Sequence, residues 1–148
     1  MPANDKEAPV AVSFRLTISG TESAGVFKEA TGFDSESEVS EIKRSLPNGR
    51  TEVVKAAGNA KWSDIELKRG VDQDKSLWNW RKLVIAGKLD AARKDCTITM
   101  LDYEGQPVVT YSIINAWPKK YTGVGLKADS NEVAVEGITL SHEGFEVK

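Results

Sequence analysis

The sequence has little of the chemistry on which most enzymes and metalloproteins depend. Its 148 residues include one cysteine, Cys96, and one histidine, His142. A single cysteine excludes an internal disulfide, and neither residue belongs to a Cys/His cluster with metal-ligand spacing. Cys96 alternates with Ile98 and Met100, which is typical of a core residue, and no neighbour that would activate its thiolate is visible. The sequence therefore predicts no catalytic residue, no metal site and no cofactor.

Long apolar runs and an excess of positive charge are also missing. No stretch approaches the roughly 18 apolar residues of a membrane-spanning helix, so we expect no membrane binding by this chain. The start, MPANDKEAPVAV, lacks the basic and apolar regions of a secretory signal, so we expect none. A net charge of −2 argues against a general nucleic-acid-binding protein, because such proteins usually carry a basic excess. The length and the 40% hydrophobic content fit one globular domain.

The hydrophobic pattern predicts a mainly β protein. FRLTISG (14–20) alternates strictly between apolar and polar residues, as a half-buried strand does. Further strands are predicted at 26–33, 34–44, 61–70, 95–101, 106–117 and 131–145, with a hairpin turn at DYEG. In the last of these the apolar parity changes between Val135 and Ile138, which predicts a β-bulge at Gly137. The result is about seven strands, mostly antiparallel.

One helix is predicted within DKSLWNWRKLVIAG (74–87). Asp72 or Asp74 could cap its N-terminus, and Gly87 is suited to end it. Its apolar stripe consists of Leu77, Trp80 and Val84.

The middle of the chain does not have the residue pattern of ordinary core structure. Residues 34–44 are polar on both faces, which suggests that one face borders water. The segment SLPNGRTEVVKAAGNA (45–60) is predicted to be a long loop, and such loops are usually functional or interfacial. Residues 1–11 are predicted to be a flexible arm. The expected organisation is thus a single domain, 1–148, with an arm at 1–11 and a long loop at 45–60.

Four blocks of sequence together resemble a known family. They are FKEATGFDSESEV, DIELKRGVDQDKSLWNW, NAWPKKYTG and NEVAVEGITLSHEGF. Their order and spacing resemble those of the tail tube proteins of contractile phages, especially the inner-tube proteins of extracellular contractile injection systems. The type VI secretion tube protein is a more distant relative. The resemblance spans Phe14 to Phe145, and LKRG (67–70), the Trp78–Trp80 pair and NAWP (115–118) are together fairly specific.

The resemblance implies an antiparallel β-sandwich or open barrel with one flanking α-helix. It also implies homohexameric rings that stack into a hollow tube, inside a sheath, that conducts DNA or effector cargo. The partners would be further copies of the chain, the sheath protein, and baseplate and tube-initiator or terminator proteins. Assembly would take place in the bacterial cytoplasm, as part of a phage tail or of a tail-like particle that can be released.

Residue roles follow from the same resemblance. It assigns the 45–60 segment to contacts between subunits and rings, although SLPNG replaces the more glycine-rich opening expected there. The contact candidates in and around that loop are Lys43, Arg44, Leu46, Arg50, Glu52, Val53, Val54 and Lys55. In the barrel, Trp80 is expected in the core, Trp117 at the end of a strand, and Pro118 at a corner that turns the chain and leaves Lys119 and Lys120 facing outward.

Strand parity predicts which residues line the channel. Glu36, Glu38 and Ser40 share one face and are the lumen candidates, since negative charge keeps the wall hydrated and repels nucleic acid. Val39 is expected to lean toward the core. The competing interpretation places this run on the outer wall, against the sheath.

Two other classes of protein remain open from the sequence. The four tryptophans could line the cavity of a monomeric β-barrel that binds a small ligand, although such rings lie more often in cores and interfaces. An enzyme with an unrecognised site is the second alternative.

Overall fold

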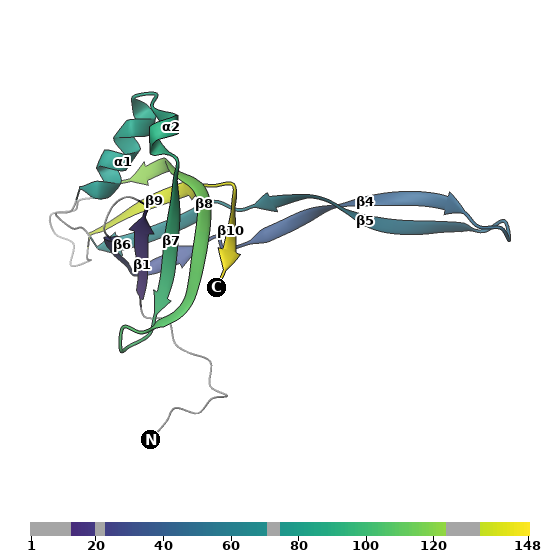
Figure 1. The fold of residues 1–148 in the computed structure, drawn as a ribbon, viewed down its shortest axis with the longest axis horizontal. Coiled ribbons are helices and arrows are strands. Elements are labelled where there is room, and N and C mark those ends of the chain that lie inside the picture. Colours follow the sequence, from purple (N-terminus) through teal and green to yellow (C-terminus); the bar gives the residue numbers. More distant parts are fainter. Residues whose placement is uncertain (1–12, 20–22, 71–74, 124–133) are drawn as a thin grey trace, which may run out of the picture. The chain divides into compact units, whose positions relative to one another are not determined.

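The computed structural model describes residues 13–19, 23–70, 75–123 and 134–148 (Figure 1). The described strands pair antiparallel throughout, which confirms the predicted mainly β, antiparallel class. The chain separates into two compact units, residues 1–32 with 64–148, here called the body, and residues 33–63, here called the hairpin. The arm at 1–11, the candidate caps Asp72 and Asp74, and the second half of the expected TGVG turn lie outside the described residues.

The body contains one eight-stranded sheet that changes direction at a bent strand. Its order is β2-β1-β7-β8-β9-β6-β3, with β10 also paired to β8. The first half of β8 pairs with β7 and β10, and its second half pairs with β9. In Figure 1 the strands β1, β7 and the first half of β8 cross in front of β6 and β9. The body strands are β1 (Ser13–Ile18), β2 (Ser23–Phe27), β3 (Glu29–Thr31), β6 (Ile65–Gly70), β7 (Lys94–Leu101), β8 (Pro107–Thr122), β9 (Val135–Ser141) and β10 (Gly144–Val147).

A second bend, between β2 and β3, brings together the first and last strands of this order. β2 pairs with β1, while β3, which begins two residues after β2 ends, pairs with β6. At the break the backbone N–H of Lys28 donates to the carbonyl of Lys68 at 2.9 Å. The body is therefore barrel-like, with one corner in β8 and one between β2 and β3.

The core lies between the crossed strand layers. Alternate residues of β1 and β7 point inward, as the period of two requires, and the strands of the second layer contribute Leu67 and Leu140. The fully buried side chains include Leu16, Phe27, Ile65, Leu67, Leu77, Ile98, Ile113, Ile138 and Leu140.

Within the described residues two helices, rather than the one predicted, flank β8. Helix α1 (Ser76–Ile85) buries Leu77 and Trp80, and α2 (Leu89–Ala92) is a single short turn. The Trp80 indole N–H donates to the Ala92 carbonyl at 2.6 Å and so joins the two helices. Gly87 has a φ of +79°, and the N–H groups of Gly87 and Lys88 bond back to the last turn of α1. This Schellman-type ending explains why glycine stops the helix there.

Two expectations about the late strands are wrong. The strand does not end at Trp117, because β8 runs through Pro118 to Thr122. The bulge is not at Gly137, which pairs regularly with Lys68. The shift lies instead between Pro118 and Lys120 on the facing strand. The parity of β9 changes because the charged Glu136 takes an inward position next to Ile138 and Leu140, all three of which are buried.

The second unit is a single long antiparallel hairpin. β4 (Ser35–Ser45) and β5 (Thr51–Trp62) pair from Ser35↔Trp62 to Ser45↔Thr51. The predicted strand at 34–44 is confirmed, and the predicted loop at 45–60 is wrong, because residues 51–60 belong to β5. The alanines and glycine of AAGNA favour strands weakly by themselves, and pairing with β4 decides their conformation.

Candidate assembly surfaces

The hairpin is built as a ribbon with a tight end. At its tip the Leu46 N–H donates to the Arg50 carbonyl at 2.7 Å, the Asn48 side chain accepts from the Arg50 N–H at 3.0 Å, and Gly49 has a φ of +82°. Nearer the base, Ser37 pairs with Ala60 and Val39 with Ala57. β5 therefore has one residue more than β4 between these pairs, which is a β-bulge. Gly58 lies there, and a Cβ added to it would stand 3.1 Å from the Glu38 carbonyl oxygen.

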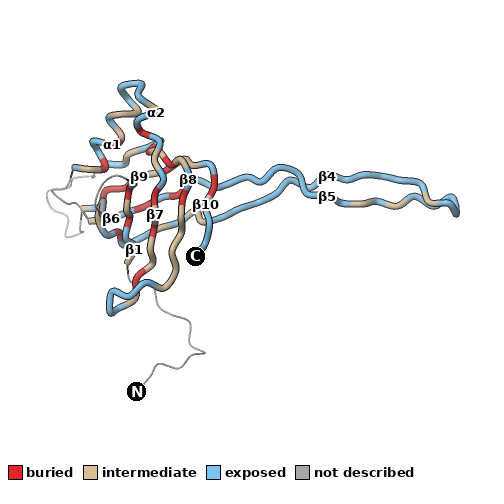
Figure 2. Tube along the Cα trace, in the orientation of Figure 1, coloured by how far each residue is buried: buried red, intermediate tan, exposed pale blue. Residues whose placement is uncertain are grey.

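The hairpin exposes apolar side chains on both of its faces. Val39 is 65% exposed, Ile42 55% and Val53 50%, and every residue of β4 is classed as exposed (Figure 2). Val39 therefore does not lean toward a core, contrary to expectation. An isolated two-stranded ribbon is at best marginally stable in water, so these side chains are suited to burial against another surface.

The predicted contact residues divide between the two faces of this ribbon. Residues directly opposite one another share a face, so Arg44 lies with Glu52, and Lys43 lies with Val53. Arg44 Nε donates to Glu52 Oε2 at 2.9 Å. The remaining candidates are Leu46 and Arg50 in the tip, Val54 on the Arg44 face and Lys55 on the Lys43 face.

The predicted lumen residues lie on one face of β4, as strand parity required. Glu36 pairs with Lys61 and Ser40 with Ala56, while Glu38 forms a 2.6 Å ion pair with Lys61. The same face continues into Ile42 and its partner Val54. The charge of Glu38 is thus balanced by Lys61, and the acidic face adjoins apolar side chains, which a hydrated acidic wall would not require.

A second extended polar surface, which the sequence analysis did not single out, covers the outer face of the body sheet. Cross-strand partners form one row of Thr17, Thr97, Ser112 and Glu146 and another of Arg15, Thr99 and Thr110. The inward partners of the same strands include Leu16 and Ile98, which are fully buried. The sequence pattern that could have predicted this face is the alternation in TISG, CTIT and VVTYS, where a hydroxyl-bearing residue recurs at every second position.

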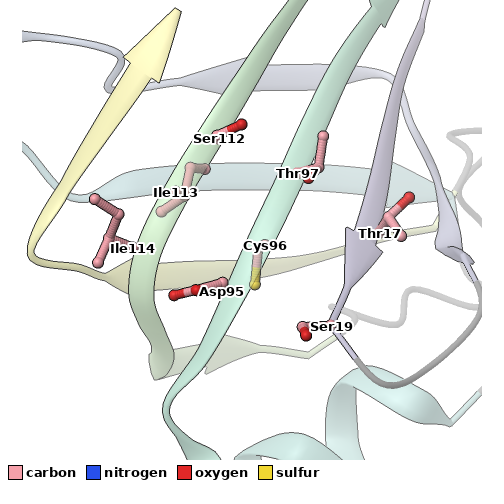
Figure 3. Close-up of a pocket in the computed structure, with 8 residues that line it drawn as sticks. All are labelled: Thr17, Ser19, Asp95, Cys96, Thr97, Ser112, Ile113 and Ile114. Carbon is pink, nitrogen blue, oxygen red and sulfur yellow. The ribbon is translucent and has the colours of Figure 1, made fainter.

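A shallow pocket of about 380 Å³ opens in this part of the sheet (Figure 3). Hydroxyl-bearing residues from three strands line it, including Thr17 of β1, Thr97 of β7 and Ser112 of β8. Cys96 also borders the pocket, but it is only 3% exposed. Burial first, and the nearby charge of Asp95 second, raise the pKa of its thiol to about 12. A thiol in this state is a poor nucleophile at neutral pH.

The corner at Trp117 and Pro118 is a change of strand partner. Just before it, Asn115 has a φ of +49°, its N–H donates to Asp95 Oδ1 at 3.0 Å, and its side chain donates to Glu143 Oε2 at 2.6 Å. Pro118 is fully buried, whereas Trp117 is half-buried. The strand thus bends without ending.

The two lysines after the corner are both exposed. Lys119, at the β8 register shift, pairs with Asp64 at 2.5 Å. Lys120 lies opposite Thr139 of β9.

A buried charged cluster joins β6, β8 and β9. Arg69 and Glu136 are 3% and 6% exposed, and their Nε and Oε1 atoms are 2.6 Å apart. Tyr121 donates its hydroxyl to Glu136 Oε2 at 2.7 Å. That hydrogen bond, together with burial, raises the pKa of Tyr121 above its ordinary value. Phe27 faces the Arg69 guanidinium, whose centre lies 5.3 Å from the ring centroid.

The described residues contain no group of three or more His, Cys, Asp or Glu side chains arranged to hold a metal ion. His142 is engaged through its Nδ1, which accepts the Gly144 N–H at 3.1 Å. None of the helices in the described ranges is long and apolar enough to cross a membrane. The described residues instead present surfaces: a long exposed hairpin, a polar sheet face and sheet edges. They define the class of protein as a β-rich structural subunit.

Comparison with protein families gives this class a specific identity. Residues 10–146 match the T4-like virus tail tube protein gp19 model. The chain belongs to this family, as its sequence blocks predicted, and is a structural tube subunit. No curated protein matches the chain.

Solved structures share the fold over nearly the whole chain. One, from the sheath-tube complex of the extracellular contractile injection system PVC in its extended state, has a TM-score of 0.74 at 24% identity and covers 97% of this chain and 93% of that one. The PVC sheath/tube terminator has a TM-score of 0.69 at 25% identity, with 97% and 99% covered. Hcp1 from Flavobacterium johnsoniae has a TM-score of 0.52 at 14% identity, with 91% and 94% covered.

Proposed function

We propose that this chain forms homohexameric rings that stack into the hollow inner tube of a contractile tail or injection system. Family membership supports the tube, and the similarity to the tube fold of the PVC sheath-tube complex supports a contractile context. The sheath protein would surround the tube, and baseplate and initiator or terminator proteins would bind its ends. Assembly would occur in the bacterial cytoplasm, and the channel would conduct effector cargo or DNA.

The observation that carries this proposal is the construction of the polar sheet. Among the described strands, β2 pairs only with β1 and β10 pairs only with β8. Two such edges on one sheet invite pairing with further strands. Pairing of β10 in one copy with β2 in the next would continue the sheet around a ring and cover both of these edges.

The same geometry supplies a wall for the channel. If the sheets close around a central space with their hydroxyl rows inward, the lumen is lined by Thr17, Thr97, Thr99, Thr110 and Ser112, with Glu146 and Arg15 each at the end of one row. These side chains are hydrated but mostly uncharged, so a passing polymer meets no strong binding site. Glu36, Glu38 and Ser40 remain the rival lumen candidates, predicted from strand parity alone.

The hairpin would hold copies together within and between rings. Its exposed Val39, Ile42 and Val53 would become buried against a neighbouring copy, while charged residues of the predicted contact set would fix the register at the edge of the contact. Burying apolar surface drives association, and charges mainly confer specificity.

Electron microscopy of the purified chain tests the assembly. We expect rings or tubes with sixfold end views in negative stain, and a high-molecular-weight species in sedimentation. A chain that stays a 16.2 kDa monomer at high concentration, even with baseplate components added, would contradict the proposal and favour the small-ligand β-barrel.

A cysteine scan separates the two candidate lumen walls. Thr97→Cys and Glu38→Cys, each in Cys96→Ala, are labelled in sheathless tubes with a bulky maleimide that enters only at the tube ends. Slow labelling at position 97, compared with a cysteine at position 120, supports the sheet face as the wall. Slow labelling at position 38 with fast labelling at 97 would reinstate the acidic run of β4.

A further inference from the structure

The outward side of helix α1 carries a regular stripe of cations and large apolar residues. Lys75, Trp78, Lys82 and Ile85 follow one another at spacings of three or four, so they share one side of the helix. Trp78 packs edge-to-face against Tyr121 of β8, with ring centroids 5.3 Å apart, and remains 40% exposed. Ile85 is 61% exposed, and both lysines are exposed. The opposite side is occupied by Leu77 and Trp80, which are buried. We call these four exposed residues the helical stripe.

The segment of helices α1 and α2 is rich in positive charge, and three acidic residues, Asp72, Asp74 and Asp95, flank it in the chain. Between residues 75 and 94 there are six basic residues and one acidic residue, a net of +5 in a chain whose total is −2. The one acid, Asp90, is paired with Arg93 at 3.6 Å. None of the ion pairs within the described ranges involves Lys75, Lys82 or Lys88. An acidic surface would therefore be attracted to this end of the body.

The opposite end of the same strands presents the complementary chemistry. β7 starts at Lys94, just after α2, and runs to Leu101. Eight residues are separated by seven rises of about 3.3 Å, which places its far end roughly 23 Å away. There the turn at 102–106, here called the acidic turn, displays Tyr103, 81% exposed, between Asp102 and Glu104. In Figure 1 the helices and the β7–β8 turn stand at opposite ends of the body.

The acidic turn is held in one conformation before any partner binds. Asp102 Oδ1 accepts the N–H groups of Glu104 and Gln106, each at 2.9 Å. Gly105 takes a φ of +75°, and its N–H donates to the Asp102 carbonyl at 3.1 Å. A preorganised turn loses little conformational entropy on binding. It offers an aromatic ring flanked by carboxylates to a tryptophan flanked by lysines.

We propose that the helical stripe of one copy binds the acidic turn of a copy in the next ring, so that rings stack head to tail along the direction of β7. This inference rests on the proposed tube. The two surfaces are different and lie at opposite ends of one subunit, so the contact is heterologous and repeats without closing. A single contact of this size is weak, but the copies of a ring act together, and multivalency makes the stack stable.

Charge reversal and its rescue test the contact. The variants are Lys82→Glu, Glu104→Lys and the double variant, with Lys120→Glu as a control that makes the same charge change at an exposed residue of β8. Asp102 is left intact because it holds the turn. The readouts are the fraction of protein in pelletable tubes at low salt, ring counts by negative stain, and thermal melting.

We expect each single variant to keep rings and its melting temperature but to lower the tube fraction at least about tenfold, because like charges would then face each other. The double variant should recover the wild-type fraction, and Lys120→Glu should match wild type. Tyr103→Ser, which leaves every charge in place, should also lower the tube fraction.

Single variants that stack like wild type, or a double variant that fails to recover, would overturn the head-to-tail contact while leaving the ring-forming function intact. A wild-type chain that forms neither rings nor tubes would overturn the function and the contact together.

Discussion

The body and the hairpin bury their side chains in opposite ways. All of the buried hydrophobic residues belong to the body, whereas β4 is exposed along its entire length and β5 is exposed or half-buried. The body can close two sheet layers over a core, but a two-stranded ribbon has no second layer to cover either face. The body therefore carries the stability of the subunit, and the hairpin is suited to contact with another molecule.

The charges of the two regions differ in the same way. The Arg69–Glu136 pair of the body is almost completely buried, while the hairpin pairs Arg44–Glu52 and Lys61–Glu38 are exposed. An exposed pair contributes about 0–1 kcal/mol. Breaking a buried pair costs about 3–5 kcal/mol, since one charge remains without its partner. Substitutions that break the Arg69–Glu136 pair should therefore affect folding, whereas substitutions in the two hairpin pairs should mainly affect association.

Shortening the hairpin should have the largest effect, because it separates the stability of the body from the assembly role of the hairpin. Replacing residues 37–60 by Asn-Gly joins the paired Glu36 and Lys61 through a two-residue turn. We expect a folded body with a thermal melting temperature near that of wild type but a complete loss of tubes in electron microscopy. Normal tubes from the shortened chain would show that the hairpin is dispensable for assembly.

Trp80→Ala should have the largest effect on folding. It removes a side chain that is 4% exposed and its hydrogen bond to Ala92, and large-to-small core changes of this kind cost about 3–5 kcal/mol. Urea unfolding of the free subunit, followed by circular dichroism, measures the loss. A change near zero would mean that the core does not depend on the contact between helices α1 and α2.

Tyr121→Phe should have an intermediate effect that depends on pH. The lost hydrogen bond goes to a buried carboxylate, so we expect a cost of about 1.5–3 kcal/mol at pH 7. Because the folded-state pKa of Tyr121 is raised, its contribution is fully present below the unfolded-state value of about 10 and is lost as the pH rises through the folded-state value. The difference between wild type and variant should therefore shrink in alkaline solution, and a difference that is constant with pH would contradict this origin.

Val39→Ala should have the smallest effect on the subunit and so provides the matched control for Trp80→Ala. The side chain is 65% exposed, and surface substitutions usually change the free energy of unfolding by less than about 0.5 kcal/mol. In tubes the same substitution should increase the critical concentration for assembly. A loss of subunit stability comparable to that of Trp80→Ala would contradict the division between body and hairpin.

The sequence predicted much of the body because its signals are local. Strict alternation located β1 and β7, and the i, i+3, i+7 stripe and Gly87 located α1. The prediction from alternation was wrong in β9, because the charged Glu136 occupies an inward position that an apolar residue would normally take. Its partner Arg69 lies 67 residues away in the chain, in β6, and no residue near Glu136 in the sequence indicates that pairing.

Local sequence patterns determined the antiparallel β class and the helix, since both depend on residues that are close neighbours in the chain. The sequence also carried enough of the family pattern to indicate a tail tube subunit. The tertiary structure alone decided that 51–62 is a strand, that β8 passes through Pro118, and that the hydroxyls of β1, β7 and β8 line up on one face. Strand pairing and register depend on partners distant in sequence, so weakly patterned segments acquire their structure only when the partner strand is in place.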